Sequence, residues 1–353
     1  MNDKKRENWI DFVKLIAMLI VVMNHASCTV PLISFWGGMF FVPVFFVLSG
    51  FTYVYRDEKF PVVMRKKARR LLAPYFTANF ILLVFFLLKD VVFTHTKSVS
   101  QMMQSIFGVF YARNQIFSFD HQTLFVPVNR TNYYLLTNLN SPTWFLPALF
   151  LTIFMFECSV RIFGKELKKL WFTAACSLLL GVIYHYVSPV LLMWSLDAVP
   201  FFYLLFLIGY TMQVCDTMHW FDKHIRVLVL SLAGLVISAF INGSTNFSIA
   251  QYGKSVTLAL YNAACSSICI MYICRRAKAV IPNFLGVAGR QTLFVLCYHM
   301  LLLSVLRTVL PQMPLFVAVL ITMVLLILVG MVKEKLMNHL KQRQQRREKD
   351  AKK

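Results

Sequence analysis

Acidic residues are scarce in this sequence, which has 353 residues, 15 Asp and Glu, 36 Lys and Arg, and a formal net charge of +21. Several catalytic signatures are missing too: the chain has no glycine-rich phosphate loop, no HExxH and no G-x-S-x-G. These absences exclude the protein classes that depend on those motifs, namely P-loop nucleotide-binding proteins, HExxH metalloproteases and G-x-S-x-G serine hydrolases. The chain also lacks a clear internal repeat, which counts against inverted-repeat transporter folds.

The eight cysteines form neither a metal-binding nor a disulfide framework. Nearly all lie in or beside apolar segments and none has CxxC spacing, so we interpret them as small core residues and expect no metal. The first apolar segment has no small-x-small exit, so we expect a retained helix and not a cleaved signal. No low-complexity linker divides the chain. We therefore expect a single membrane domain over 1–332 and a basic tail over 333–353.

Apolar residues dominate the chain. Hydrophobic residues make up 58% of it, with 33 Phe and a mean hydropathy of +0.64. Repeated apolar runs of about 20 residues predict an all-α, polytopic membrane protein with about ten transmembrane helices. The predicted spans lie near 9–28, 36–55, 71–93, 142–163, 170–188, 196–214, 226–243, 254–274, 289–307 and 313–332.

The placement of Lys and Arg predicts the orientation. If the N-terminus is cytoplasmic, most of them fall in inner segments, and only Lys97, Arg113, Arg130, Lys254 and Arg307 fall in outer ones. By the positive-inside rule, both termini are then cytoplasmic. The only long loop, 94–141, is extracytoplasmic, and we expect the basic tail to lie near anionic lipid and not on nucleic acid.

The first span carries charges that are unusual inside a membrane. Asp11 and Lys14 lie about one turn apart and can pair, and His25 follows Lys14 by eleven residues. Eleven residues make three turns plus about 20°, so Lys14 and His25 share one helix face, roughly 16 Å apart along the axis. Intramembrane charges usually face a partner or a wet cavity. The alternative is that they are ordinary interfacial residues, with the lysine snorkelling to the headgroups.

Two segments follow that could line a cavity. Residues 36–55 contain Pro43, which removes a backbone donor, and a Ser49-Gly50 pair, which lets another backbone approach closely. They predict a kinked helix beside a cavity, although plain helix packing explains them equally well. Residues 65–75 read R-K-K-A-R-R-L-L-A-P-Y, and this density of cations predicts a cradle for a polyanion such as a nucleotide. Positive-inside anchoring is the alternative explanation for that cluster.

Four further polar or aromatic residues are candidates for a functional role. Trp144 opens the fourth predicted span, and Glu157 is a buried-carboxylate candidate toward its inner end. Asp197 lies near the outer boundary, where His25 also ends, so the two could form a dyad. His299 falls roughly at mid-membrane in the ninth predicted span.

Five short motifs in order resemble the integral-membrane acyltransferase family 3, particularly its fucose 4-O-acetylase-like branch. They are I-D-F-V-K-L-I-A-M-L-I-V-V-M-N-H (10–25), V-P-V-F-F-V-L-S-G-F (42–51), K-A-R-R-L-L-A-P-Y (67–75), T-W-F-L-P-A-L-F (143–150) and the G-x-x-T-L-F-V-L-x-x-H ending (289–299). The resemblance covers about residues 8 to 307. Lys14 and Lys67 stand where the family often has Arg, which keeps the charge but loses the bidentate fork.

The resemblance implies a ten-span bundle in the cell membrane that moves an acyl group, expected to be acetyl, from cytoplasmic acyl-CoA to a hydroxyl of an extracytoplasmic glycan or lipid-linked sugar. His25 would be the catalytic base or form a covalent acyl intermediate, assisted by Asp11 and Lys14. The expected contacts to the donor phosphates are Lys14, Lys67, Arg69 and Arg70, and the expected substrate contacts are Trp144, Asp197 and His299. Acyl-CoA would be a substrate, and no cofactor would be bound permanently.

Two other functions stay open on the sequence alone. A secondary transporter or glycan exporter could use the same Asp11, Lys14 and His25 set to relay protons or bind substrate. A glycan-assembly partner without chemistry of its own would tolerate changes at Lys14 and His25. Substrate flux without CoA consumption would indicate the transporter.

Overall fold

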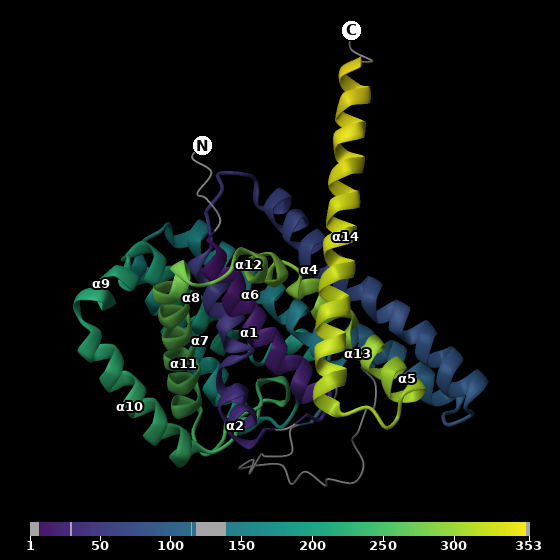
Figure 1. The fold of residues 1–353 in the computed structure, drawn as a ribbon. Coiled ribbons are helices and arrows are strands. Elements are labelled where there is room, and N and C mark those ends of the chain that lie inside the picture. Colours follow the sequence, from purple (N-terminus) through teal and green to yellow (C-terminus); the bar gives the residue numbers. More distant parts are fainter. Residues whose placement is uncertain (1–6, 29, 114, 118–138, 351–353) are drawn as a thin grey trace. The chain divides into compact units, whose positions relative to one another are not determined.

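We describe the protein from a computed structural model, over residues 7–28, 30–113, 115–117 and 139–350. In these residues the chain is helical with two isolated β-bridges and no strand (Figure 1). The helices are α1 (Asn8–His25), α2 (Pro31–Phe40), α3 (Pro43–Phe51), α4 (Phe60–Phe86), α5 (Val99–Tyr111), α6 (Phe145–Phe163), α7 (Leu167–Val187), α8 (Val199–Val214), α9 (Thr217–Lys223), α10 (Ile225–Asn242), α11 (Val256–Arg276), α12 (Asn283–Gly289), α13 (Thr292–Val309) and α14 (Leu315–Asp350). A π-helix, η1 (Leu87–Phe93), continues α4, and four short 3₁₀-helices complete the order: η2 (Ser141–Trp144), η3 (Met193–Ser195), η4 (Phe247–Ile249) and η5 (Ala277–Ala279).

Nine helical segments within the described ranges are long and apolar enough to cross a membrane. Nine of the ten predicted spans overlap one of them. The exception is 36–55, where the chain forms two short helices, α2 and α3, in place of one long helix. Pro43 stands at the first position of α3, where its missing N–H costs no helical hydrogen bond, so it starts a new helix where the sequence predicted a kink.

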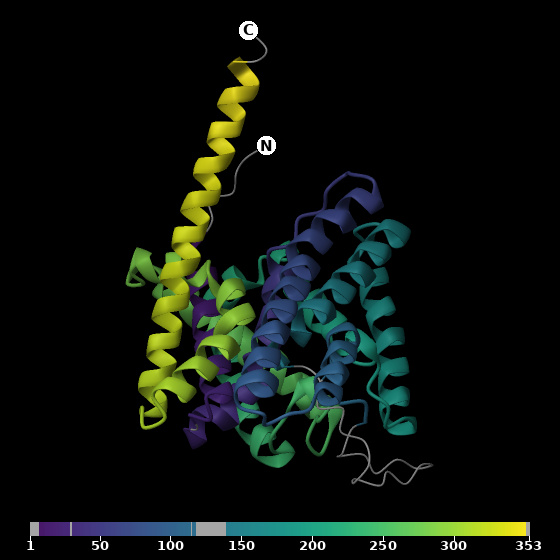
Figure 2. The same cartoon turned by 90° about the vertical axis from the view of Figure 1, so that its right-hand side faces the viewer.

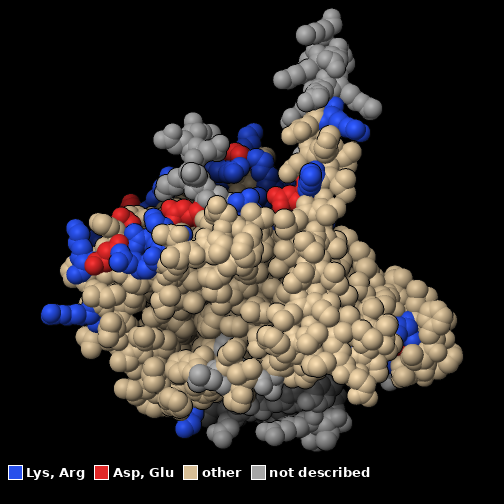
Figure 3. Space-filling view, in the orientation of Figure 1, with Lys and Arg blue, Asp and Glu red and all other residues tan. Residues whose placement is uncertain are grey.

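The chain divides into two compact units. Unit 1 combines the two ends of the chain, Met1–Thr29 and Ala277–Lys353, and unit 2 comprises Val30–Arg276. In unit 1, α1 packs against α12, α13 and α14. Helix α14 is one continuous rod that carries the predicted basic tail as an extension of the last span (Figures 1 and 2). The first half of α14 carries no charged residue, and charged residues begin at Lys333 (Figure 3).

Unit 2 is organised by a close crossing of α3 and α8. A Cβ added at Gly50 would lie 1.9 Å from the carbonyl oxygen of Phe206, and one added at Gly209 would lie 1.9 Å from that of Val47. Only glycine permits this mutual approach of two backbones. Beside the crossing, the rings of Phe46 and Phe202 stack in parallel with centroids 4.1 Å apart. The predicted close approach at Gly50 is therefore present, with α8 as the partner.

The predicted outer loop, 94–141, contains structure of its own. Helix α5 lies within it, and the Tyr75 hydroxyl donates a 2.5 Å hydrogen bond from α4 to the Val109 carbonyl of α5. Residues 118–138, including Arg130, lie outside the described part. The described beginning of this loop is thus a helix docked on α4.

The carboxylate of Asp222 on α9 links this helix to α11. Asp222 accepts hydrogen bonds from Arg275 Nη1 at 3.0 Å and from the Tyr272 hydroxyl at 3.1 Å. The hydrogen bond from Arg275 is the main reason why the pKa of Asp222 lies below its ordinary value. Figure 3 shows acidic and basic side chains gathered at the α9 end of the unit.

The exposed faces of α7 and α10 are strongly apolar. Phe172 and Leu180 on α7 are 72% and 67% exposed, and Leu230 and Phe240 on α10 are 71% and 69% exposed. Side chains of this kind would be costly in water across two whole helices. Together with the long apolar helices, they identify a membrane protein.

Candidate active site

Three charged side chains meet at the start of α1. Lys14 Nζ donates a 3.1 Å hydrogen bond to Asp11 Oδ1, as the spacing predicted, and Arg290 Nε lies 3.8 Å from Asp11 Oδ2. Asp11 is fully buried, so its charge needs these two partners. Arg290 was not among the site residues predicted from the sequence. The structure places it in the cluster with Lys14.

A glycine allows Arg290 to reach Asp11. Helix α12 ends at Gly289, and a Cβ there would lie 1.9 Å from the carbonyl oxygen of Asp11. The backbones of α12 and α1 therefore approach more closely than any larger residue would allow. This contact places the next residue, Arg290, beside the Asp11 carboxylate. The glycine at the start of the last motif is the only sequence signal for it.

Two histidines of unit 1 lie side by side. His25 is the last residue of α1 and His299 lies within α13, and their ring centroids are 5.4 Å apart with a tilt of 53° between the planes. The sequence suggested both as functional residues, but it did not predict that they are neighbours. No spacing could show this, because they stand on separate helices from opposite ends of the chain.

The tautomer of His299 follows from its hydrogen bond. Its Nδ1 lies 2.9 Å from the carbonyl oxygen of Val295, which can only accept, so Nδ1 carries the proton. The other nitrogen, Nε2, then presents a lone pair. It is buried and has no hydrogen-bond partner. The free lone pair of this buried imidazole, beside a second imidazole, can accept a hydrogen bond or a proton.

The basic segment of unit 2 lines a cavity of about 420 Å³. Its walls are Arg56, Val63, Lys66, Lys67, Arg69 and Arg70. The predicted cations Lys67, Arg69 and Arg70 are thus brought together, and Arg56 and Lys66 join them. Arg56 lies before α4, outside the run that drew attention in the sequence. Five cations around one hollow provide what a polyanion with several phosphates needs.

Asp197 is held by a buried arginine in unit 2. Arg113 Nη2 donates to Asp197 Oδ1, and the backbone N–H of Leu192 donates to the same oxygen at 3.0 Å. Arg113 also donates to the carbonyl oxygens of Leu192 at 3.2 Å and Ser248 at 2.7 Å. We considered a dyad of Asp197 with His25. In the structure the carboxylate is engaged by Arg113.

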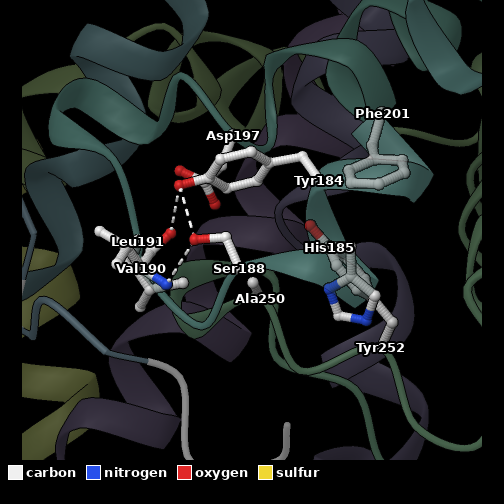
Figure 4. Close-up of a pocket in the computed structure, with 9 residues that line it drawn as sticks. All are labelled: Tyr184, His185, Ser188, Val190, Leu191, Asp197, Phe201, Ala250 and Tyr252. Carbon is white, nitrogen blue, oxygen red and sulfur yellow. Dashed lines mark hydrogen bonds between the residues drawn. The ribbon is translucent and has the colours of Figure 1, made fainter. Parts of the chain in front are cut away.

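Next to Asp197 is a small cavity of about 10 Å³, large enough for one water molecule (Figure 4). Among its lining residues, the Tyr184 hydroxyl donates a 2.9 Å hydrogen bond to the Val190 carbonyl and accepts one from Ser188 Oγ at 3.3 Å. The hydroxyl of Tyr252, also in the lining, is buried without a partner. This hollow is too small for a sugar or an acyl chain as it stands.

Trp144 lies in η2, in the interior of unit 2. It is 5% exposed, and its ring packs against Phe202 with centroids 5.9 Å apart. This predicted substrate residue thus packs in the core of unit 2. Within the described ranges, no three His, Cys, Asp or Glu side chains gather as a metal site.

The comparison with known families decides the class of protein. Residues 7–333 match the family model described as an acyltransferase domain, which is nearly the whole chain. The chain belongs to the integral-membrane acyltransferase family 3. It is thus a membrane acyltransferase, and the resemblance of its five motifs to this family is confirmed at the family level. No curated protein and no solved structure matches it significantly.

Proposed function

We propose that this acyltransferase moves an acyl group, acetyl in the first instance, from cytoplasmic acyl-CoA to a hydroxyl of an extracytoplasmic glycan or glycolipid in the cell membrane. We place it in the fucose 4-O-acetylase-like branch on the strength of its motifs. The observation that carries the proposal is the His25–His299 pair, in a chain whose family performs acyl transfer. Two adjacent imidazoles, one with a free buried lone pair, suit a reaction that moves a proton.

In the proposed reaction His25 is the general base. It accepts the proton of the sugar hydroxyl as the hydroxyl oxygen attacks the thioester carbonyl carbon, and the carbon–sulfur bond then breaks. The CoA thiolate takes the proton back from the imidazolium, so the products are the sugar ester and CoA thiol. His299 would contact the substrate next to His25. General-base assistance of this kind contributes about 10²- to 10⁴-fold to a rate.

The donor phosphates are assigned to the basic cavity of unit 2. Acyl-CoA is a polyanion that cannot enter lipid, and Lys67, Arg69 and Arg70 offer charge-assisted hydrogen bonds to its phosphates. Lys14 is assigned to the donor as well. Its charge is held by the buried Asp11, which also faces Arg290. Both chain termini are then cytoplasmic, on the side of the donor.

The test is transfer of acetyl label from acetyl-CoA to membrane glycan, with release of CoA thiol measured in the same sample. We expect transfer by the wild type and a loss of at least about 100-fold in His25→Ala. His224→Ala is the matched control, because His224 is exposed at the end of α9 and should leave transfer unchanged. Transport of substrate without release of CoA thiol would contradict the proposal and favour a transporter.

A further inference from the structure

Beside the basic cavity of unit 2 lies a buried polar cluster that the proposed reaction does not use. It consists of Tyr53, which follows α3, and of Glu157 and Arg161 on α6. Tyr53 and Glu157 are 5% and 2% exposed, so both are almost entirely removed from solvent. Glu157 Oε2 lies 3.6 Å from Arg161 Nε, and the Tyr53 hydroxyl lies beside the same carboxylate.

Each member of this cluster has a buried polar atom without a hydrogen-bond partner. The atoms are Tyr53 Oη, Glu157 Oε2 and Arg161 Nε. The last two face each other as an ion pair at 3.6 Å, a geometry too long for a hydrogen bond. Arg161 cannot turn freely to improve it, because its Nη2 donates a 2.7 Å hydrogen bond to the Glu58 carbonyl. A buried polar group without a hydrogen-bond partner destabilises the fold, so three of them together call for an occupant that satisfies them.

Lys67 joins the cluster to the cavity. Its side chain lines the cavity, and its Nζ lies 5.8 Å from the centre of the Tyr53 ring. A ligand whose charged end occupies the cavity therefore meets the cluster as the next polar feature. Around the cluster the walls are aromatic: Phe156 and Tyr210 lie 4.9 and 5.8 Å from the Tyr53 ring.

The chemistry of the three atoms specifies a neutral, amide-like partner. The carboxylate oxygen only accepts, the guanidinium nitrogen only donates, and the hydroxyl can do both. A further phosphate would be repelled by the Glu157 carboxylate at low dielectric, and a cation would face Arg161 and Lys67. An amide offers an N–H to the carboxylate and a carbonyl to the guanidinium.

We propose that Tyr53, Glu157 and Arg161 form a subsite for the amide groups of the pantetheine arm of acyl-CoA. This inference rests on the proposed function, because it takes the donor phosphates to occupy the cavity that Lys67 shares. It adds a specificity that phosphate contacts cannot give. The protein would distinguish CoA from other phosphorylated adenosines by the arm that follows the phosphates.

The test compares two ligands on the full-length protein in nanodiscs: CoA, and 3′-phosphoadenosine 5′-diphosphate, which carries the same phosphates without the arm. We expect Tyr53→Phe to weaken CoA binding about 3- to 10-fold and Glu157→Gln to weaken it about tenfold or more, by the loss of one hydrogen bond each. Binding of the armless nucleotide should stay within about twofold in Tyr53→Phe and stay equal or tighten in Glu157→Gln. Tyr55→Phe, in the same loop, is the matched control for both ligands.

The other outcomes are also decisive. If the two ligands weaken equally in Tyr53→Phe and Glu157→Gln, the cluster only positions Lys67 and the subsite is wrong. If the wild type binds both ligands with equal affinity, the arm is not recognised, and the subsite fails while the phosphate site stands. If the wild type binds neither, the assignment of acyl-CoA as donor fails and the subsite fails with it.

Discussion

The pair of Arg113 and Asp197 gives a quantitative prediction, because the sequence suggested Asp197 as a substrate contact and the structure buries it. The side chain of Arg113 is fully buried and that of Asp197 is 6% exposed. Asp197→Asn keeps the size and one accepting oxygen but removes the charge. The guanidinium then remains buried with only the carbonyl oxygens of Leu192 and Ser248 as further partners.

The magnitude follows from what remains buried. Removing one partner of a buried ion pair costs about 3–5 kcal/mol, since an uncompensated charge is left behind. Because Asn can still accept a hydrogen bond, we expect Asp197→Asn near the lower end and Asp197→Ala near the upper end. At about 2–4 °C per kcal/mol, the melting temperature falls by roughly 6–20 °C. Replacing both partners, as Arg113→Met with Asp197→Leu, should cost less than Asp197→Ala.

Thermal unfolding of the purified protein in detergent measures this effect. Asp216→Asn is the control, because Asp216 is exposed and forms no part of the pair. If Asp197→Asn keeps the wild-type melting temperature and loses only acyl transfer, the carboxylate is a substrate contact and the buried-pair reasoning is refuted. If both properties change together, the loss of transfer reflects the loss of fold.

Three further predictions follow. Gly209→Ala should overpack the crossing of α3 and α8, because its Cβ would lie 1.9 Å from the Val47 carbonyl oxygen. We expect the free energy of unfolding to fall by about 1–3 kcal/mol, measured as a lower melting temperature. An unchanged melting temperature would contradict this packing. In His299→Asn the amide can still donate to a backbone carbonyl, but Nε2 is lost. Acyl transfer should therefore fall while the fold stays intact. A pH–rate profile equal to that of the wild type would argue against a role of His299 in proton movement. The depressed pKa of Asp222 means that its bond to Arg275 stabilises the fold above the unfolded pKa of about 3.8 and is lost as the pH falls through the lower folded pKa. The gap in melting temperature between wild type and Asp222→Asn should therefore shrink on acidification; a gap that is independent of pH would count against it.

Local sequence patterns predicted the features that depend on neighbours along the chain. The charges at Asp11 and Lys14 lie one helical turn apart, and their ion pair is present. Apolar runs predicted the long helices, and Pro43 predicted the interruption after α2, although as a kink and not as two helices. The ordered motifs predicted the family, which the match over residues 7–333 confirms.

Contacts between distant segments were not predictable in this way. His25 and His299 come from opposite ends of the chain, and a helical period says which face a residue occupies but not which helix covers it. Arg290 reaches Asp11 only because Gly289 lets the backbones of α12 and α1 approach closely. A single glycine in a sequence does not predict such a contact. Likewise, the sequence predicted Arg113 only as a cation of an outer segment. In the structure Arg113 is buried and forms an ion pair with Asp197.

The central claim is that His25 moves a proton in acyl transfer from cytoplasmic acyl-CoA. The most direct test uses sealed vesicles with acetyl-CoA supplied only on the cytoplasmic face and glycan acceptor only on the other. We predict labelled glycan and an equal amount of CoA thiol with wild type, and a loss of at least about 100-fold with His25→Ala at equal protein level. Undiminished transfer by His25→Ala, or transfer only when donor and acceptor share one face, would contradict the account.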